Sequence, residues 1–167
     1  HMWVESTPGV GSTFLFTARF GLDATTTQTA LPCPQGLDRA QILVAESNAE
    51  SLKALSEILS AWDITYTSAT DGNELRQALT QHRYDLCLLA SQLADMSGTE
   101  AAELLLNTAQ TPHIAFMVQL TDITAIEMWS AEKNVDVLLK PLLQEELFTA
   151  LTRFFAAPDT TDLPAPE

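Results

Sequence analysis

The residue types that could do chemistry stand directly after short apolar runs. Glu46 and Ser47 follow QILVA, while Lys140 follows VDVLL. A carboxylate and an ammonium group that meet across the strand ends can form an ion pair, worth roughly 0–1 kcal/mol at a surface. Ala90 follows YDLCLL, where an α/β protein usually carries its reactive group. A methyl group has no lone pair, so this position is chemically inert.

Other candidate residues give no catalytic or metal-binding pattern. Cys33 lies in a proline-rich stretch and Cys87 in an apolar run, so the two thiols have neither metal-ligand spacing nor a disulfide framework. Two unpaired thiols fit a reducing cytoplasm. His82 is expected at a helix end and His113 at the start of a strand, both as ordinary residues.

The charge balance excludes two classes of partner. The 167 residues contain 22 Asp and Glu against 8 Lys and Arg, a formal net charge of −14. Such a surface repels nucleic acid phosphates and anionic lipid, so we expect neither nucleic acid binding nor membrane contact by this segment. No apolar run approaches the roughly 20 residues needed to cross a bilayer.

Five short apolar runs alternate with five segments of helical periodicity. The helical spacing is clear in the first, where Leu52, Leu55, Leu59 and Trp62 share one face and Asn48 is a plausible N-cap. The predicted strands are 41–46, 64–69, 84–90, 113–118 and 135–139, and the predicted helices are 49–62, 71–83, 97–109, 123–133 and 142–155. This order predicts an α/β fold with a doubly wound, flavodoxin-like, five-stranded parallel sheet, (βα)5, covered by helices on both faces.

The chain divides into four parts. Residues 1–20 form two strand-like runs around a turn with Gly9 and Gly11, residues 21–40 a linker, residues 41–156 the α/β domain and residues 157–167 a disordered linker.

Residues 41–156 resemble the receiver domain of two-component signalling. The resemblance is carried by QILVAESNAES, by DGNEL, by YDLCLLASQLADMSGTE and by LLKPL, which contains Lys140 and Pro141. A receiver transfers a phosphoryl group to an Asp at the end of its third strand. Acidic residues after the first strand hold the Mg²⁺ ion that offsets phosphoryl charge, and a Ser or Thr and a Lys contact the phosphoryl group.

The resemblance implies a degenerate site, because three of its positions carry other residue types. The acceptor position falls on Ala90, the acidic pair on Glu46 and Ser47, and the Ser or Thr position on Met117. Lys140 is the remaining phosphoryl-contacting group. We therefore predict a pseudoreceiver that is not phosphorylated, with no catalytic residue, no cofactor and no Mg²⁺ site, since one carboxylate and a hydroxyl are a poor cage for Mg²⁺. Lys140 is expected to pair with Glu46.

Two alternatives stay open. One is an active receiver with Asp95, in the following loop, as a displaced acceptor. The other is a receiver-like sensor of a small ligand, although Met117 and Val118 would fill the emptied pocket and disfavour a polar ligand.

The segment WVESTPGVGSTFLFTARF resembles the last hairpin of the ATP-binding domain of sensor histidine kinases, through its Gly-x-Gly-Ser/Thr-x-Phe pattern. The order of parts then implies a hybrid sensor kinase. We expect the fragment itself not to be an enzyme and to lie on the cytoplasmic side of a membrane-bound parent kinase. Its partners would be the kinase core and relay domains, with a homodimer left open. Trp62 is expected in the core, and the interaction face is expected to contain Ile126, Trp129, Val137 and Phe148.

Overall fold

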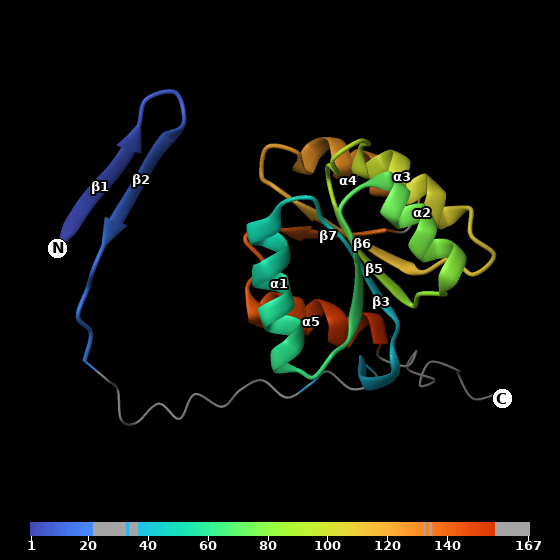
Figure 1. The fold of residues 1–167 in the computed structure, drawn as a ribbon. Helices are drawn as coiled ribbons and strands as arrows, with labels where there is room; N and C mark the ends of the chain where they lie inside the picture. Colours follow the sequence, from blue (N-terminus) through green and yellow to red (C-terminus); the bar gives the residue numbers. More distant parts are fainter. Residues whose placement is uncertain (22–32, 34–36, 132, 134, 156–167) are drawn as a thin grey trace. The chain divides into compact units, whose positions relative to one another are not determined.

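The computed structural model describes residues 1–21, 33, 37–131, 133 and 135–155 (Figure 1). The chain separates into two compact units, residues 1–30 and residues 31–167. Most of the predicted linker at 21–40 and the predicted disordered tail at 157–167 lie outside the described residues.

The first unit is an antiparallel hairpin of β1 (Met2–Thr7) and β2 (Gly11–Phe16). Gly9 and Gly11 have φ values of +77° and +140° in the connection, a region that favours glycine. The prediction of two strands around a glycine turn is confirmed. Leu15 is half-buried and every other hairpin residue is exposed, so this unit has no core of its own.

The second unit alternates strands and helices as predicted. Its elements are a short 3₁₀ helix η1 (Leu37–Arg39), β3 (Ile42–Ala45), α1 (Ala49–Ala61), β4 (Tyr66–Ala69), α2 (Gly72–Gln81), β5 (Leu86–Ala90), α3 (Gly98–Leu106), β6 (His113–Val118), α4 (Ile123–Ala131), β7 (Asp136–Leu139) and α5 (Gln144–Phe155). The strands are parallel, in the order β4-β3-β5-β6-β7. This is the predicted flavodoxin-like topology.

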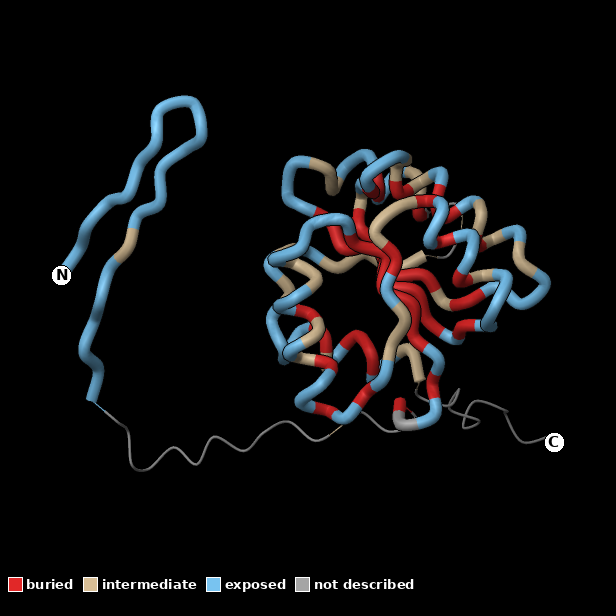
Figure 2. Tube along the Cα trace, viewed as in Figure 1, coloured by how far each residue is buried: buried red, intermediate tan, exposed pale blue. Residues whose placement is uncertain are grey.

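Strand residues alternate between two apolar layers, because successive side chains of a strand point to opposite faces. Leu43, Cys87 and Phe116 face the layer that contains α2, α3 and α4. Ile42 and Leu88 face the layer that contains α1 and α5. Figure 1 shows these helices on the two faces of the sheet, and Figure 2 shows the buried strands between them. A parallel sheet covered in this way explains why its strands read as unbroken apolar runs.

The second layer extends the domain beyond its predicted start. Leu37, in η1, is 1% exposed and belongs to the same apolar layer as Trp62, and Ala40 is also buried. The α/β unit therefore includes residues that sequence reasoning assigned to the linker. Trp62 is buried as predicted, at 4% exposure.

Three helices begin with a side chain that caps the backbone N–H groups. Asn48, Asp71 and Ser97 accept hydrogen bonds from the N–H groups of Ser51, Glu74 and Glu100. Each cap follows the loop after a strand, so it sets where that loop ends and the helix begins.

Candidate functional site

The predicted site residues meet at the carboxyl-terminal edge of the sheet. The register pairs Ala90 with Met117 across β5 and β6. Glu46 follows the last residue of β3, and Lys140 follows the last residue of β7. Carboxyl ends of parallel strands share one edge, which explains why residues almost a hundred positions apart in the chain come together.

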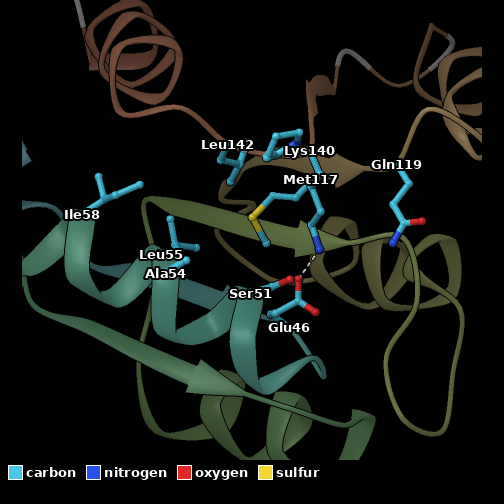
Figure 3. A pocket seen from close by; sticks show the side chains of 10 residues that line it. Glu46, Ser51, Ala54, Leu55, Ile58, Met117, Gln119, Lys140 and Leu142 are labelled. Carbon is cyan, nitrogen blue, oxygen red and sulfur yellow. Dashed lines mark hydrogen bonds and ion pairs between the residues drawn. The ribbon is translucent and has the colours of Figure 1, made fainter. Parts of the chain in front are cut away.

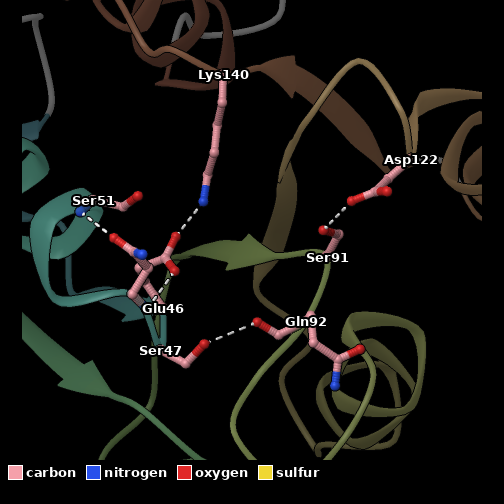
Figure 4. A network of polar contacts seen from close by, with 8 residues as sticks. Glu46, Ser47, Ser51, Ser91, Gln92, Asp122 and Lys140 are labelled. Atoms are coloured by element: carbon pink, nitrogen blue, oxygen red, sulfur yellow. Dashed lines mark hydrogen bonds and ion pairs between the residues drawn. The ribbon is translucent and has the colours of Figure 1, made fainter. Parts of the chain in front are cut away.

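Glu46 and Lys140 form the ion pair that was predicted. Lys140 Nζ donates to Glu46 Oε2, and the backbone N–H of Asn48 donates to Glu46 Oε1 at 2.8 Å (Figure 4). The Glu46 carboxylate is 3% exposed and the Lys140 side chain 19% exposed. Both oxygens of the Glu46 carboxylate therefore have a donor, and the lysine neutralises its charge.

Ala90 is buried at the end of β5, with 3% exposure. The start of α3 packs closely on this strand end, since a Cβ at Gly98 would lie 2.4 Å from the Ala90 carbonyl oxygen. The next side chain, Ser91, donates its hydroxyl to Asp122 Oδ2 at 2.9 Å, on the opposite side from Glu46 in Figure 4. The acceptor position thus carries a methyl group in a tightly packed place. Sequence reasoning did not find the Ser91–Asp122 pair, because the two residues lie in separate loops.

Ser47 occupies the second acidic position and joins two loops. Its hydroxyl donates to the carbonyl oxygen of Gln92 at 3.3 Å, which links the β3–α1 loop to the β5–α3 loop (Figure 4). An aspartate here would place a second negative charge beside a carbonyl oxygen. The observed serine favours the loop contact over metal binding.

Met117 and Val118 end β6 on opposite faces of the sheet. Met117 is 1% exposed within the α1–α5 layer, and Val118 is fully buried in the other layer. Neither side chain offers a hydroxyl to this edge. The position at which the resemblance implies a Ser or Thr is therefore occupied by the buried apolar side chain of Met117.

Asp95, the displaced acceptor of the alternative hypothesis, lies in the β5–α3 loop. Its Oδ1 accepts a hydrogen bond from the backbone N–H of Gly72 at 2.7 Å, at the first residue of α2. This carboxylate joins the loop to a helix start, and the side chain remains exposed.

The four predicted interaction-face residues do not form one exposed patch. Ile126 is 6% exposed and belongs to the core below α4, so its expected accessibility is wrong. Trp129 and Val137 are half-buried on the same core, with the Trp129 ring edge-on to Phe116 at 5.5 Å between centroids. Phe148 packs in the other layer, 6.0 Å from the Trp62 ring.

The apolar side chains that are strongly exposed are not the four that were predicted for the interaction face. Leu120 and Met128 are 72% and 73% exposed, and Leu143 is 56% exposed. Helix α4 is apolar on almost every side, so its sequence does not indicate which side chains face solvent.

The donor set at this edge does not fit the divalent ion that the resemblance implies. Mg²⁺ takes six oxygen ligands and is usually held by more than one carboxylate or phosphate oxygen. Glu46 is the one acidic residue among the predicted site positions, and both its oxygens are engaged. Among the residues that the structure describes, no group of three His, Cys, Asp or Glu side chains is placed to hold a metal ion.

Comparison with known proteins agrees with the fold and places it in a family. Residues 42–152 match the response regulator receiver domain family. The autoinducer 2 sensor kinase/phosphatase LuxQ of Vibrio vulnificus is 30% identical over 124 residues, which make up 73% of this chain and 14% of that protein. The chain therefore spans about 14% of the length of this relative.

Two solved structures show the same fold at low identity. A CheY-like response regulator receiver domain from Methylobacillus flagellatus has a TM-score of 0.62 and 18% identity, covering 69% of this chain and 98% of its own. The receiver domain of a sensor histidine kinase from Pseudomonas aeruginosa, with a magnesium ion coordinated in its active site cleft, has a TM-score of 0.59 and 20% identity, covering 69% and 96%. In the described part of this chain, no helix has the length and apolar character of a membrane span.

Proposed function

This chain belongs to the response regulator receiver domain family, a family of signalling modules, and from that premise we propose that residues 41–156 are a pseudoreceiver of a hybrid sensor histidine kinase. The proposal is that this module takes no phosphoryl group and acts in a two-component phosphorelay through protein contacts. The observation that carries it is the buried methyl group of Ala90 at the acceptor position.

The surrounding groups support the same conclusion. Aspartyl phosphorylation needs a carboxylate oxygen to attack phosphorus in line, and cations to offset the charge on the phosphoryl oxygens. Ala90 supplies no nucleophile, and Lys140 is already engaged by Glu46. We extend the proposal to Mg²⁺, because a single engaged carboxylate is a weak ligand set for it.

The parent protein is proposed from the sequence relatives and from the hairpin. LuxQ, an autoinducer 2 sensor kinase/phosphatase, is the kind of protein that would carry this segment. The exposed hairpin with Gly9 and Gly11 fits the last two strands of a kinase ATP-binding domain. The partners would be the kinase core and the relay domains, on the cytoplasmic side.

Phosphorylation chemistry tests the proposal directly. The chain is incubated with acetyl phosphate and Mg²⁺, and its intact mass is measured. We expect no gain in mass. The variant Ser47→Asp/Ala90→Asp/Met117→Thr restores the missing groups and should gain one phosphoryl group, which shows that the assay works on this fold.

A phosphoryl gain by the unaltered chain would contradict the proposal. The variant Asp95→Ala then identifies the acceptor, since loss of the gain in that variant would establish Asp95 as a displaced phosphoacceptor. Retention of the gain would direct the search to other carboxylates.

The regulatory part of the proposal has its own test. A module without a phosphorylation switch can shift a kinase between states only by binding those states with different affinity. Deletion of residues 41–156 from the parent kinase should change its autophosphorylation or phosphotransfer rate. Rates equal to those of the intact kinase would leave the module a passive spacer.

A further inference from the structure

The Glu46–Lys140 pair forms one end of a cavity that extends away from the acceptor position. The cavity is about 480 Å³ and opens between α1 and the turn that joins β7 to α5. This volume is within the roughly 300–1,000 Å³ typical of small-molecule sites. The cavity lies on the α1 side of Met117, so its existence does not depend on whether the acceptor position is inert.

One wall of the cavity is apolar. It is made by Leu55 and Ile58 of α1, by Met117 of β6 and by Leu142 after the turn, with the small Ala54 leaving space between them (Figure 3). Leu55 and Met117 are buried in the domain core, which makes this wall part of the rigid layer beneath α1. Such a wall favours an alkyl chain or a ring over water.

The other end of the cavity offers hydrogen-bond donors. A lysine ammonium has three N–H donors, and Lys140 gives one to Glu46. Ser51 and Gln119 also line the cavity, and neither side chain has a hydrogen-bond partner among the described residues. Glu46 keeps a second donor in the N–H of Asn48, so its charge stays hydrogen-bonded if Lys140 is shared. The donors at this end therefore suit an anionic group.

We propose that this cavity binds a small organic anion with an apolar body, such as a medium-chain carboxylate. The carboxylate lies against Lys140 and Gln119, and the chain lies along Ala54, Leu55 and Met117. The inference goes beyond the pseudoreceiver proposal, since it concerns a ligand bound between α1 and the turn after β7. It holds or fails whatever the outcome of the phosphorylation assay.

Octanoate is the probe, with octanol and octylammonium as matched molecules of the same chain length. Each is titrated into the ¹⁵N-labelled full chain, and amide shifts are followed by NMR. We expect octanoate to shift residues 54–58, 117 and 140–142 and to bind about tenfold more tightly than octanol, the gain expected from a hydrogen bond to a charged group. Equal binding of the three probes, or octanoate shifts centred elsewhere, would overturn the proposal.

Two variants test the apolar wall and the charged end of the cavity independently. Ala54→Leu fills the cavity from an exposed position of α1 and should abolish octanoate binding, whereas Ala61→Leu, the same change on the same helix outside the cavity, should leave it intact. Lys140→Met should weaken octanoate about tenfold and leave octanol unchanged. Unchanged octanoate affinity in Ala54→Leu would refute the site even if Lys140→Met is too unstable to study.

Discussion

At the scale of single residues, the candidate site has two main features: the side chain of Ala90 and the ion pair between Lys140 and Glu46. Ala90 carries a buried methyl group, which under the proposed function leaves no nucleophile, and Lys140 pairs with Glu46. In a receiver site the lysine contacts a phosphoryl group; here a carboxylate of the same chain takes that place. The Glu46 carboxylate would hold Lys140, and with it the start of the turn after β7, in one position.

The ion pair should contribute measurably to stability because Glu46 is buried. Lys140→Met leaves the carboxylate with the Asn48 N–H as its remaining donor, and we expect a loss of about 2 kcal/mol in the free energy of unfolding by urea. This is less than for a fully buried pair, because the lysine is partly hydrated. The double variant Glu46→Gln/Lys140→Met should recover most of the loss.

Lys53→Met is the matched control, since Lys53 is an exposed lysine of α1. Its effect should stay within about 0.5 kcal/mol. If both lysine variants unfold at the same urea concentration, the Glu46–Lys140 pair adds nothing to stability.

The buried thiol of Cys87 should be inert in the native protein. Cys87 is fully buried in β5, and burial raises the pKa of its thiol, so the reactive thiolate is scarce near neutral pH. In a Cys33→Ser variant, we expect Ellman's reagent to label Cys87 only at urea concentrations that unfold the chain. Rapid labelling without urea would mean that the sheet opens far more easily than its packing indicates.

At the scale of elements, the loops at the carboxyl edge are held in place by side-chain hydrogen bonds to the backbone. Ser47 joins two loops, and Asp95 bonds the start of α2. Gly98 lets α3 start against the end of β5, because any side chain there would collide with the Ala90 carbonyl. The edge is therefore fixed by hydrogen bonds and close packing.

The start of α3 should be sensitive to pH. Ser97 donates to the Glu100 carboxylate from its backbone N–H at 2.9 Å and from its hydroxyl at 2.8 Å, and these hydrogen bonds lower the pKa of Glu100. The folded-state pKa thus lies below the unfolded value of about 4.3. The ionised Glu100 carboxylate therefore stabilises the folded state fully above that pH, and this stabilisation is lost as the pH falls through the folded-state pKa.

Glu100→Gln should accordingly lower the melting temperature near neutral pH, and the difference from the unaltered chain should shrink below about pH 4. Glu57→Gln, a change at an exposed carboxylate of α1, is the control and should show little difference at either pH. A difference for Glu100→Gln that is the same at both pH values would show that the carboxylate charge is not what stabilises the helix start.

At the scale of the whole molecule, each unit is stabilised internally in a different way. The α/β unit has two apolar layers that share one sheet, whereas the hairpin exposes Val10, Phe14 and Phe16 at 84%, 68% and 73%. A two-stranded hairpin is marginal in water without a further surface to cover it. This is what we expect of a piece of a larger sheet.

Removal of residues 1–30 should leave the melting temperature of the α/β unit unchanged. Both core clusters are made by residues from Cys33 onward, so the deletion removes none of their side chains. Calorimetry of the shortened and full chains tests this. A marked fall in melting temperature would mean that the hairpin contributes to the stability of the second unit.

The sequence by itself determined the fold and the pairing of Glu46 with Lys140. Alternating apolar runs and helical periodicity are local signals, and a parallel sheet follows from them because each strand returns through a helix. The Glu46–Lys140 pair was also predictable, because carboxyl ends of parallel strands share an edge.

Only the tertiary structure decided which side chains remain exposed and what lies beside the site. Leu37 joins the core through contacts with distant residues, and the apolar sequence of α4 does not show that Ile126 is buried while Met128 is exposed. The cavity beside Lys140 is formed by four separate parts of the chain. Local periodicity shows which face of a helix or strand is apolar. The burial of single side chains and the cavities between elements depend on how complete elements pack together.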